Sequence, residues 1–375
     1  MVGDVQRSDI RIISKMVILI CIFSFIIIVS IVHFTTLWIK LSPYNQGALE
    51  IKTFDGSDSP YHPSVLYFEE NWNGYKYWMA ETPFSPKCKP YEDRNECPSI
   101  HVSNDGIKWS EIAVNPIDDL NEKEIEELDY FSDPHLVFVD DRIECWYRFT
   151  HRNGIQDYYN NLQLVRKTST DGINWSEREV MVELATEKGN ALGNMVVSPA
   201  ILYEDGKYRM WYINSESRIY RELSYSESED GKEWRVQKKC ILNGQENMPW
   251  HIDVNYINGK YYLISYDFKD LTFWHSDDGT TFNYADKLLE PSATGSFYSY
   301  SLYRACIIKD KNLKIYFSAN DSLKTYIGLL EEDATGFRLF SDRRHRSILG
   351  LADYIIATKW RTVKFLFKRL IKTLN

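Results

Sequence analysis

Residues 169–177 read STDGINWSE, and the same order of residue types returns three more times along the chain. SNDGIKWSE begins at Ser103, SEDGKEW at Ser228 and SDDGTTF at Ser276. Gly suits a tight turn that needs a positive φ, while Asp and Ser side chains bond to the amides of such turns. One carboxylate per turn is too few for Ca²⁺, which takes about six to eight oxygens. We therefore interpret the repeat as a structural unit that fastens a hairpin.

The segments before these turns repeat as well. Pairs of β-rich runs, joined by turns such as EDGK, INGK and KDKN, begin at His62, Asp133, Ser198, His251 and Tyr303. Aromatic and β-branched runs separated by such turns are typical of hairpins. Five successive units of about four strands predict an all-β fold, a five-bladed β-propeller. The fifth unit lacks a clear Asp-Gly-x-x-Trp ending, which leaves open whether its closing strand comes from elsewhere in the chain.

Two segments outside the repeats have helical patterns. NPIDDLNEKEIEELDYF, from Asn115, predicts an inserted helix. In the segment 348–374 apolar residues such as Trp360 and Phe367 share one face and basic residues such as Lys364 share another. This basic amphipathic helix suits a membrane surface or an anionic partner, and packing on its own propeller is the equal alternative.

The N-terminal segment Met16–Trp38 contains no Asp, Glu, Lys or Arg. A membrane-spanning helix needs about 20 such residues. Arg7, Arg11 and Lys15 precede it, which predicts a cytoplasmic N-terminus. A cleaved signal peptide would have a shorter apolar core and a small-residue cleavage site, so we favour an uncleaved anchor. We therefore expect a single-pass membrane protein whose propeller is extracellular or periplasmic.

The predicted organisation has five parts: a cytoplasmic tail (1–15), a transmembrane signal anchor (16–38), a linker (39–54), the propeller (55–340) and a basic helical tail (341–375). The net charge is −9, and the acidic excess lies in the propeller, which argues against a nucleic-acid partner. Six cysteines show no metal-binding spacing, and no phosphate loop, His-Glu-x-x-His or nucleophile elbow occurs, so we predict neither metal nor cofactor. A disulfide between Cys88 and Cys97 stays open.

The repeated units resemble the five-bladed β-propeller glycoside hydrolases, both the arabinanase and xylosidase group and the invertase and levansucrase group. The resemblance rests on HPSVLYF, NECPSI, SNDGIKW, SDPHLVF and the Ser-x-Asp-Gly-x-x-Trp turns, over about residues 55–335. It implies a site in the central funnel, with an Asp, a second Asp and a Glu near the starts of the innermost strands of the first three blades. At those positions this chain has His62, Asp133 and Ser198, so two of the three carboxylates are absent.

Glycoside hydrolysis generally needs two carboxyl groups, and Asp133 alone cannot fill both roles. Glu96 and Asp253 stand at strand heads as candidate partners, and His251 lies on the same strand face as Asp253. We predict that Asp133, with Glu96 or Asp253, performs acid–base work and that His251 tunes these carboxyls. Each has a structural alternative: a turn cap for Asp133, a solvated loop acid for Glu96, and a buried polar network for His251 and Asp253.

Other strand-head residues are candidates for substrate binding. Trp250 offers a face for sugar stacking, and Arg304 suits a carboxylated or phosphorylated substrate. His62, His135 and Tyr303 complete the predicted binding set. The expected function is a membrane-anchored, glycosidase-like enzyme acting on a cell-surface or exported polysaccharide. A catalytically inactive glycan-binding or scaffold protein of polysaccharide assembly and a transglycosidase are the alternatives.

Overall fold

The computed structural model describes residues 16–17, 20–32, 47–84, 96–152, 154, 161–184, 192, 195–215, 221–244, 248–292 and 296–340. Residues 47–340 form one compact unit, and the described residues of the other unit are 16–17 and 20–32. Residues 20–32 are helical, and no helix in the described part of the chain has the length and apolar character of a membrane span. The predicted cytoplasmic tail, the C-terminal helix and Cys88 lie outside the described residues.

Five sheets follow one another along the chain, each with its strands in sequence order from one edge. Blade 1 contains β1 (Pro60–Trp72), β2 (Tyr75–Pro83), β3 (Ser99–Ser103) and β4 (Ser110–Glu111). Blade 2 contains β5 (Tyr130–Val139), β6 (Arg142–His151), β7 (Asn161–Ser169) and β8 (Glu179–Glu183). Blade 3 contains β9 (Val196–Glu204), β10 (Lys207–Ser215), β11 (Arg221–Ser228) and β12 (Trp234–Lys239).

Blade 4 contains β14 (His251–Ile257), β15 (Lys260–Tyr266), β16 (Leu271–Ser276) and β17 (Thr281–Leu289), and β13 (Ile241–Asn243) pairs with its outer strand in parallel. Blade 5 contains β18 (Ser301–Lys309), β19 (Leu313–Asn320), β20 (Thr325–Asp333) and β21 (Gly336–Leu339). The fifth blade therefore has a closing strand of its own, β21, and the N-terminal residue Ala48 adds an isolated bridge to Gly328 of β20. The predicted inserted helix is α2 (Glu122–Glu126), which begins with a capping box at Asn121.

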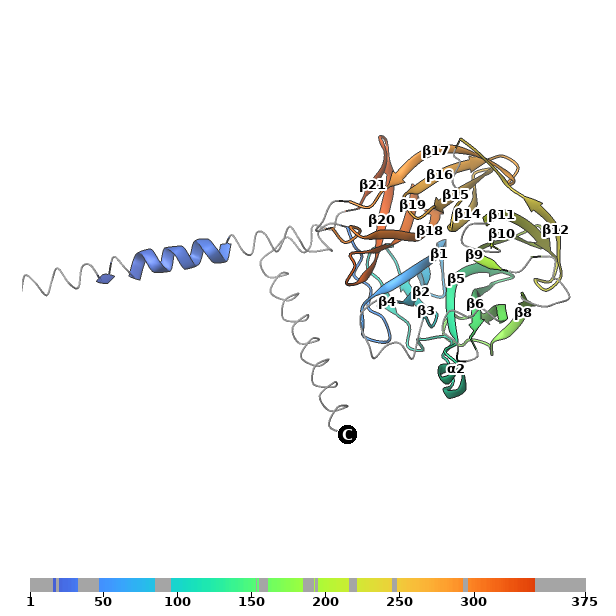
Figure 1. The fold of residues 1–375 in the computed structure, drawn as a ribbon, viewed down its shortest axis with the longest axis horizontal. Coiled ribbons are helices and arrows are strands. Elements are labelled where there is room, and N and C mark those ends of the chain that lie inside the picture. The colour runs from blue at the N-terminus through green and yellow to red at the C-terminus, as the bar shows by residue number, and fades with distance from the viewer. Residues whose placement is uncertain are drawn as a thin grey trace, which may run out of the picture. The chain divides into compact units, whose positions relative to one another are not determined.

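The five innermost strands form a closed ring. Strands β1, β5, β9, β14 and β18 contact one another in that order, and β18 returns to β1. Figure 1 shows the blades set around the centre in this order. Buried hydrophobic clusters lie between neighbouring blades, for example around Trp78 between blades 1 and 2 and around Trp146 between blades 2 and 3. The predicted five-bladed β-propeller is thus confirmed.

A β-bulge recurs at the head of the inner strands of blades 1, 2 and 3. His62, Asp133 and Ser198 each precede a proline, and each has a positive φ of 50–55°, at 53°, 53° and 52°. Proline cannot donate to a β-ladder, and the pairing register shifts at all three places. Bulges re-aim side chains and are frequent beside functional sites. The residue before each proline therefore sets the direction of one side chain at the head of its strand in blades 1, 2 and 3.

Side chains join each inner strand to the next blade. Ser64 Oγ accepts from the Leu136 amide at 2.9 Å, and Asp253 Oδ2 accepts from the Ile307 amide at 2.9 Å. Ser198 Oγ accepts from the amide of Ile252 and donates to its carbonyl, at 3.0 and 2.8 Å. The Ser318 hydroxyl accepts from the His62 amide, which closes the ring between blades 5 and 1. These bonds satisfy backbone groups that a blade cannot pair within its own sheet.

The four Ser-x-Asp-Gly turns share one hydrogen-bond pattern, which confirms their predicted structural role. In STDGINWSE the Ser169 hydroxyl accepts from the Gly172 amide at 2.8 Å, and Asp171 Oδ1 accepts from the amides of Ile173 and Asn174 at 2.8 and 2.7 Å. The other three turns repeat these bonds from Ser103 and Asp105, from Ser228 and Asp230, and from Ser276 and Asp278.

The glycine of each turn packs on an aromatic ring of the preceding blade. A Cβ on Gly172 would lie 2.1 Å from the Trp78 ring. The corresponding contacts pair Gly231 with Trp146, Gly279 with Trp211, and Gly106 with Tyr316. Trp211 and Tyr316 also donate hydrogen bonds to the carbonyls of the glycines that they cover. Each of these positions therefore requires glycine for two reasons: the backbone φ is positive, and the aromatic ring leaves no room for a Cβ.

We expect Gly172→Ala to lower the free energy of unfolding far more than Gly206→Ala. Both glycines have φ near +74°, but a Cβ on Gly206 meets nothing within 4 Å. Each substitution carries a backbone strain of about 1–3 kcal/mol, and Gly172→Ala adds a clash of about 1–3 kcal/mol with Trp78. Denaturant unfolding of both variants measures the difference. Equal destabilisation would show that the contact between blades 1 and 2 adds nothing to stability.

Candidate functional site

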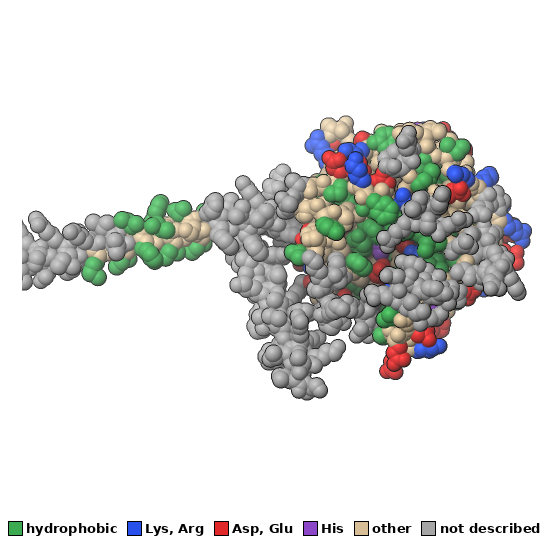
Figure 2. Space-filling view, in the orientation of Figure 1, with side chains coloured by type: hydrophobic (Ala, Val, Ile, Leu, Met, Phe, Trp, Pro, Cys, Tyr) green, Lys and Arg blue, Asp and Glu red, His purple; other side chains and the backbone are tan. Residues whose placement is uncertain are grey.

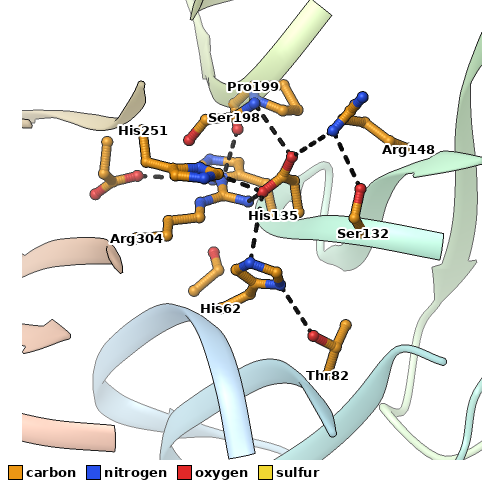
Figure 3. Close-up of polar contacts among 12 residues, drawn as sticks. His62, Thr82, Ser132, His135, Arg148, Ser198, Pro199, His251 and Arg304 are labelled. Atoms are coloured by element: carbon orange, nitrogen blue, oxygen red, sulfur yellow. Dashed lines mark hydrogen bonds and ion pairs between the residues drawn. The ribbon is translucent and has the colours of Figure 1, made fainter. Parts of the chain in front are cut away.

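Asp133, on β5, is buried in a polar cluster, and Figure 3 shows four of the surrounding residues, His62, Arg148, His251 and Arg304. Its Oδ2 accepts from Arg148 Nη1 at 3.0 Å and from the Ser198 amide at 3.3 Å. Its Oδ1 lies 3.5 Å from His251 Nδ1, 3.7 Å from Arg304 Nη1 and 4.0 Å from His62 Nε2. Blades 1, 4 and 5 therefore direct a nitrogen toward Oδ1 of this carboxylate, and blade 2 directs one toward Oδ2.

The electrostatics of the cluster keep Asp133 ionised. Burial alone would raise the pKa of Asp133, but the positive charges around it, those of Arg148 and Arg304 among them, outweigh burial and hold that pKa well below its usual range. A buried carboxylate is stable only where nearby cations and hydrogen bonds replace water. The guanidinium of Arg148 supplies a cation and a hydrogen bond at Oδ2. The same nitrogen also donates to the hydroxyl of Ser132.

His251, the first residue of β14, forms the closest imidazole partner of Asp133. Burial lowers the pKa of His251 well below its usual value, and attraction to Asp133 opposes this without reversing it. The ring is therefore neutral at neutral pH. With Nδ1 facing the carboxylate, Nδ1 carries the proton and the Nε2 lone pair is left to act as a base, the arrangement of a carboxylate–histidine pair in hydrolases.

His62, on β1, approaches the same oxygen of Asp133, and its ring centroid lies 5.9 Å from that of His251. Its Nδ1 bonds to Thr82 Oγ1 at 3.0 Å and lies 3.2 Å from Glu96 Oε2. Glu96 is buried and has a positive φ of 57°. Glu96 therefore reaches Asp133 only through His62, which acts as the intermediate group between the two carboxyls.

His135 and Asp253 belong to the same buried cluster and lie next to Arg304. His135 Nε2 donates to the Ile201 carbonyl at 2.9 Å, and burial lowers the pKa of His135 to about 3. Arg304 Nη2 donates to the Pro199 carbonyl at 2.8 Å and lies 3.4 Å from His135 Nδ1. Burial raises the pKa of Asp253 to about 7, and its Oδ1 lies 3.7 Å from His135 Nδ1. These groups form a buried network that holds Arg304 in place.

Eight buried polar atoms of this cluster lack a hydrogen-bond partner within the described structure. They are Asp133 Oδ1, His62 Nε2, His251 Nδ1 and Nε2, Arg148 Nε, Arg304 Nε and Nη1, and Glu96 Oε2. Such atoms are costly unless a ligand or solvent satisfies them. Their concentration around Asp133 Oδ1 makes this position the candidate site for a polar ligand. Among the described residues, no group of three or more His, Cys, Asp or Glu side chains is placed to hold a metal ion.

Aromatic rings border the polar cluster. The ring centroids of Tyr303 and His251 are 4.0 Å apart, and Tyr61 stacks on Tyr303 at 5.0 Å. The Trp250 indole N–H donates to the Tyr303 hydroxyl at 3.4 Å. Figure 2 shows hydrophobic side chains gathered around the centre of the propeller face, with charged ones among them. Apolar faces beside polar groups are the surfaces that sugars prefer.

The structure brings Asp133, His251, His62 and Arg304 together, while Glu96 and Asp253 each reach the cluster through a histidine. His135, Trp250 and Tyr303, the other predicted binding residues, lie against these groups. Sequence reasoning missed Arg148, which donates to the central carboxylate. The sequence signal that could have indicated Arg148 is its place as the single charged residue in the run CWYRFT of β6.

Comparisons with known proteins place this fold. No family model matches the chain. A curated relative, the A type blood N-acetyl-α-D-galactosamine deacetylase of Flavonifractor plautii, is 27% identical over an aligned length of 323 residues, and the match covers 70% of this chain. The chain spans about 40% of the length of that relative.

Solved structures give the same fold. The N-acetylgalactosamine deacetylase from F. plautii, in complex with blood group B trisaccharide, superposes with a TM-score of 0.61 at 20% identity, covering 80% of this chain and 96% of the other. The GH43_1 enzyme from Xanthomonas citri complexed with xylotriose gives a TM-score of 0.54 at 11% identity, covering 80% and 95%. The architecture implied by the sequence resemblance is therefore that of its structural neighbours.

We expect the stability difference between the wild type and Asp133→Asn to depend on pH. The folded protein holds the pKa of Asp133 below that of an unfolded Asp, so its charge stabilises the fold above about pH 4 and less as the pH falls. Asp133→Asn removes this contribution and leaves Arg148 without its charged partner, at a cost of about 3–5 kcal/mol near pH 7. Denaturant unfolding from pH 3 to 7 measures the difference. A gap of constant size across that range would contradict the buried charge.

Proposed function

We propose that this chain hydrolyses the acetamido group of an N-acetylated sugar in a glycan. The observation that carries the proposal is the Asp133–His251 pair, a buried ionised carboxylate 3.5 Å from Nδ1 of a neutral imidazole. Beside it lie unpaired guanidinium N–H groups of Arg304 and Arg148. A base of this kind next to fixed cationic donors suits attack of water on a carbonyl. The printed activity of the sequence relative supports an acetamido group as the target.

The chemistry follows from these positions. His251 Nε2 takes a proton from water as the water oxygen adds to the acetyl carbonyl carbon, and Asp133 stabilises the imidazolium that forms. The N–H groups of Arg304 and Arg148 donate to the developing oxyanion. The carbon–nitrogen bond then breaks as the imidazolium returns its proton to the amine nitrogen. The products are acetate and a sugar with a free amino group.

Glycoside hydrolysis is the second candidate, and one observation favours it. Asp253 has its pKa raised to about 7 by burial, as a general acid requires, while Asp133 stays ionised. Against this, Asp253 Oδ2 already accepts from the Ile307 amide, and neither of its oxygens is among the unpaired atoms of the cluster. These contacts make Asp253 a residue that joins blades 4 and 5, and they argue against it as the general acid.

The test measures acetate release and reducing-sugar release from one panel of N-acetylated oligosaccharides. We expect acetate from the wild type and a loss of about 10²–10⁴-fold in Asp133→Asn and His251→Gln. Asp286→Asn and His275→Gln, on exposed or partly exposed positions of blade 4, are the matched controls. Reducing-sugar release that fails in Asp253→Asn would replace this proposal with glycoside hydrolysis. Binding without either product would favour a glycan-binding protein.

The pH profile gives a second readout of the same experiment. Because burial lowers the pKa of His251, the base stays unprotonated well below pH 6.5. We expect the acidic limb of kcat/KM to fall well below that value. An acidic limb at or above pH 6.5 would contradict a base with the lowered pKa of His251.

The proposed setting is a membrane-anchored enzyme that acts on a cell-surface or exported polysaccharide. The support is the uncharged segment 16–38, preceded by three basic residues. We expect the full chain to sediment with membranes and to resist alkaline extraction. Release into the alkaline supernatant would rule out a spanning anchor.

A further inference from the structure

A guanidinium group covers two stacked aromatic rings at the seam between blades 3 and 4. Arg221, the first residue of β11, has its Cζ 4.9 Å from the ring centroid of Phe268 and 5.9 Å from that of Trp250. The Trp250 and Phe268 rings stack with centroids 5.4 Å apart. Trp250 directly precedes β14, and Phe268 lies in the turn between β15 and β16. Three separate segments thus meet at one point.

This cluster adjoins the site around Asp133. Trp250 bonds to the Tyr303 hydroxyl, and its ring centroid lies 6.0 Å from that of His251. Phe268 is 51% exposed, so one aromatic surface of the cluster is open to solvent. A ligand unit seated on these rings is therefore the neighbour of a unit seated at His251.

The backbone of Phe268 is strained in a way that serves this surface. Its φ is 73°, which is a genuine outlier for a bulky residue. The side chain gains little from burial, because half of it faces solvent. Strain of this kind persists where the position of the side chain matters for binding. The turn therefore holds an exposed ring against Trp250 at a cost in stability.

Arg221 is a cation whose donors are incompletely used. Its Nε and Nη1 are buried and have no hydrogen-bond partner within the described structure. Burial lowers the pKa of its guanidinium, and the charge of Asp267 opposes this only in part. Asp267 Oδ1 accepts instead from the amides of Lys269 and Asp270. An unpaired guanidinium N–H fits an oxygen of a carboxylate, sulfate or phosphate group.

We propose that Arg221, Trp250 and Phe268 form a second glycan subsite for an acidic sugar unit beside the unit that reacts at Asp133. The aromatic faces bind the sugar ring, and Arg221 pairs with its anionic group. The proposal rests on the proposed function only in that a glycan occupies the funnel. It makes the enzyme selective for an acidic polysaccharide.

The test is binding of the full chain to arrayed glycans that carry uronate, sulfate or phosphate groups, or no charge. We expect the wild type to prefer acidic glycans, and Arg221→Met to weaken that binding about tenfold or more with neutral glycans less affected. Arg221→Lys keeps the charge without the planar guanidinium, so its binding should fall between that of the wild type and that of Arg221→Met. Arg235→Met, an exposed arginine of β12, is the matched control. The uronate, sulfate and phosphate arms identify the anion.

Two outcomes separate this inference from the proposed function. A wild type that releases acetate but binds acidic and neutral glycans equally overturns the subsite alone. The same holds if Arg221→Met keeps the acidic preference of the wild type. A chain that binds no glycan and releases no acetate overturns both proposals.

Discussion

Each innermost strand of this propeller pairs with only one strand of its own sheet, and its other edge faces the next blade. The polar backbone groups on that edge need partners, since a buried unpaired amide or carbonyl is costly. Side chains supply them from blade to blade, and Ser198 and Asp253 are examples. The funnel is therefore lined by groups that first of all keep the ring closed, and the chemistry has to be built from what remains.

Asp133 shows how the two demands combine. Its Oδ2 joins blades 2 and 3 through the Ser198 amide, while its Oδ1 is left to the imidazoles and to Arg304. The Ser198 side chain in turn joins blades 3 and 4, at the position where the resemblance expects a catalytic Glu. A serine there removes an acid and gains a structural bond. Without the expected carboxylates, imidazole and guanidinium groups predominate around Oδ1 of Asp133.

Much of the fold could be read from the chain because its signals are local. Asp-Gly turns and paired β-runs depend on residues within a few positions of one another, so the five blades and the role of the turns were predictable. The strand heads were predictable for the same reason, since X-Pro marks each bulge. The partners of Asp133 were less so: Arg148 acts from the second strand of its blade, and the route from Glu96 through His62 depends on packing between distant segments. The position of Arg221 over the rings of Trp250 and Phe268 likewise could not be predicted, because it depends on the packing of three separate segments.

The turn glycines fasten four of the five seams, and always in one direction, onto an aromatic ring of the blade before. Within the described residues the seam between blades 4 and 5 has neither half of this contact. Blade 5 has no Asp-Gly-x-x-Trp turn, and β15 has Ile264 where β10 has Trp211. Other contacts hold this seam: Asp253 and Asn255 of β14 bond to the backbone of Ile307 in β18, and Phe273 packs edge-on against Phe337. The seam beside His251 and Arg304 therefore depends on polar side-chain bonds to one backbone position, where the other four seams have a glycine against an aromatic ring.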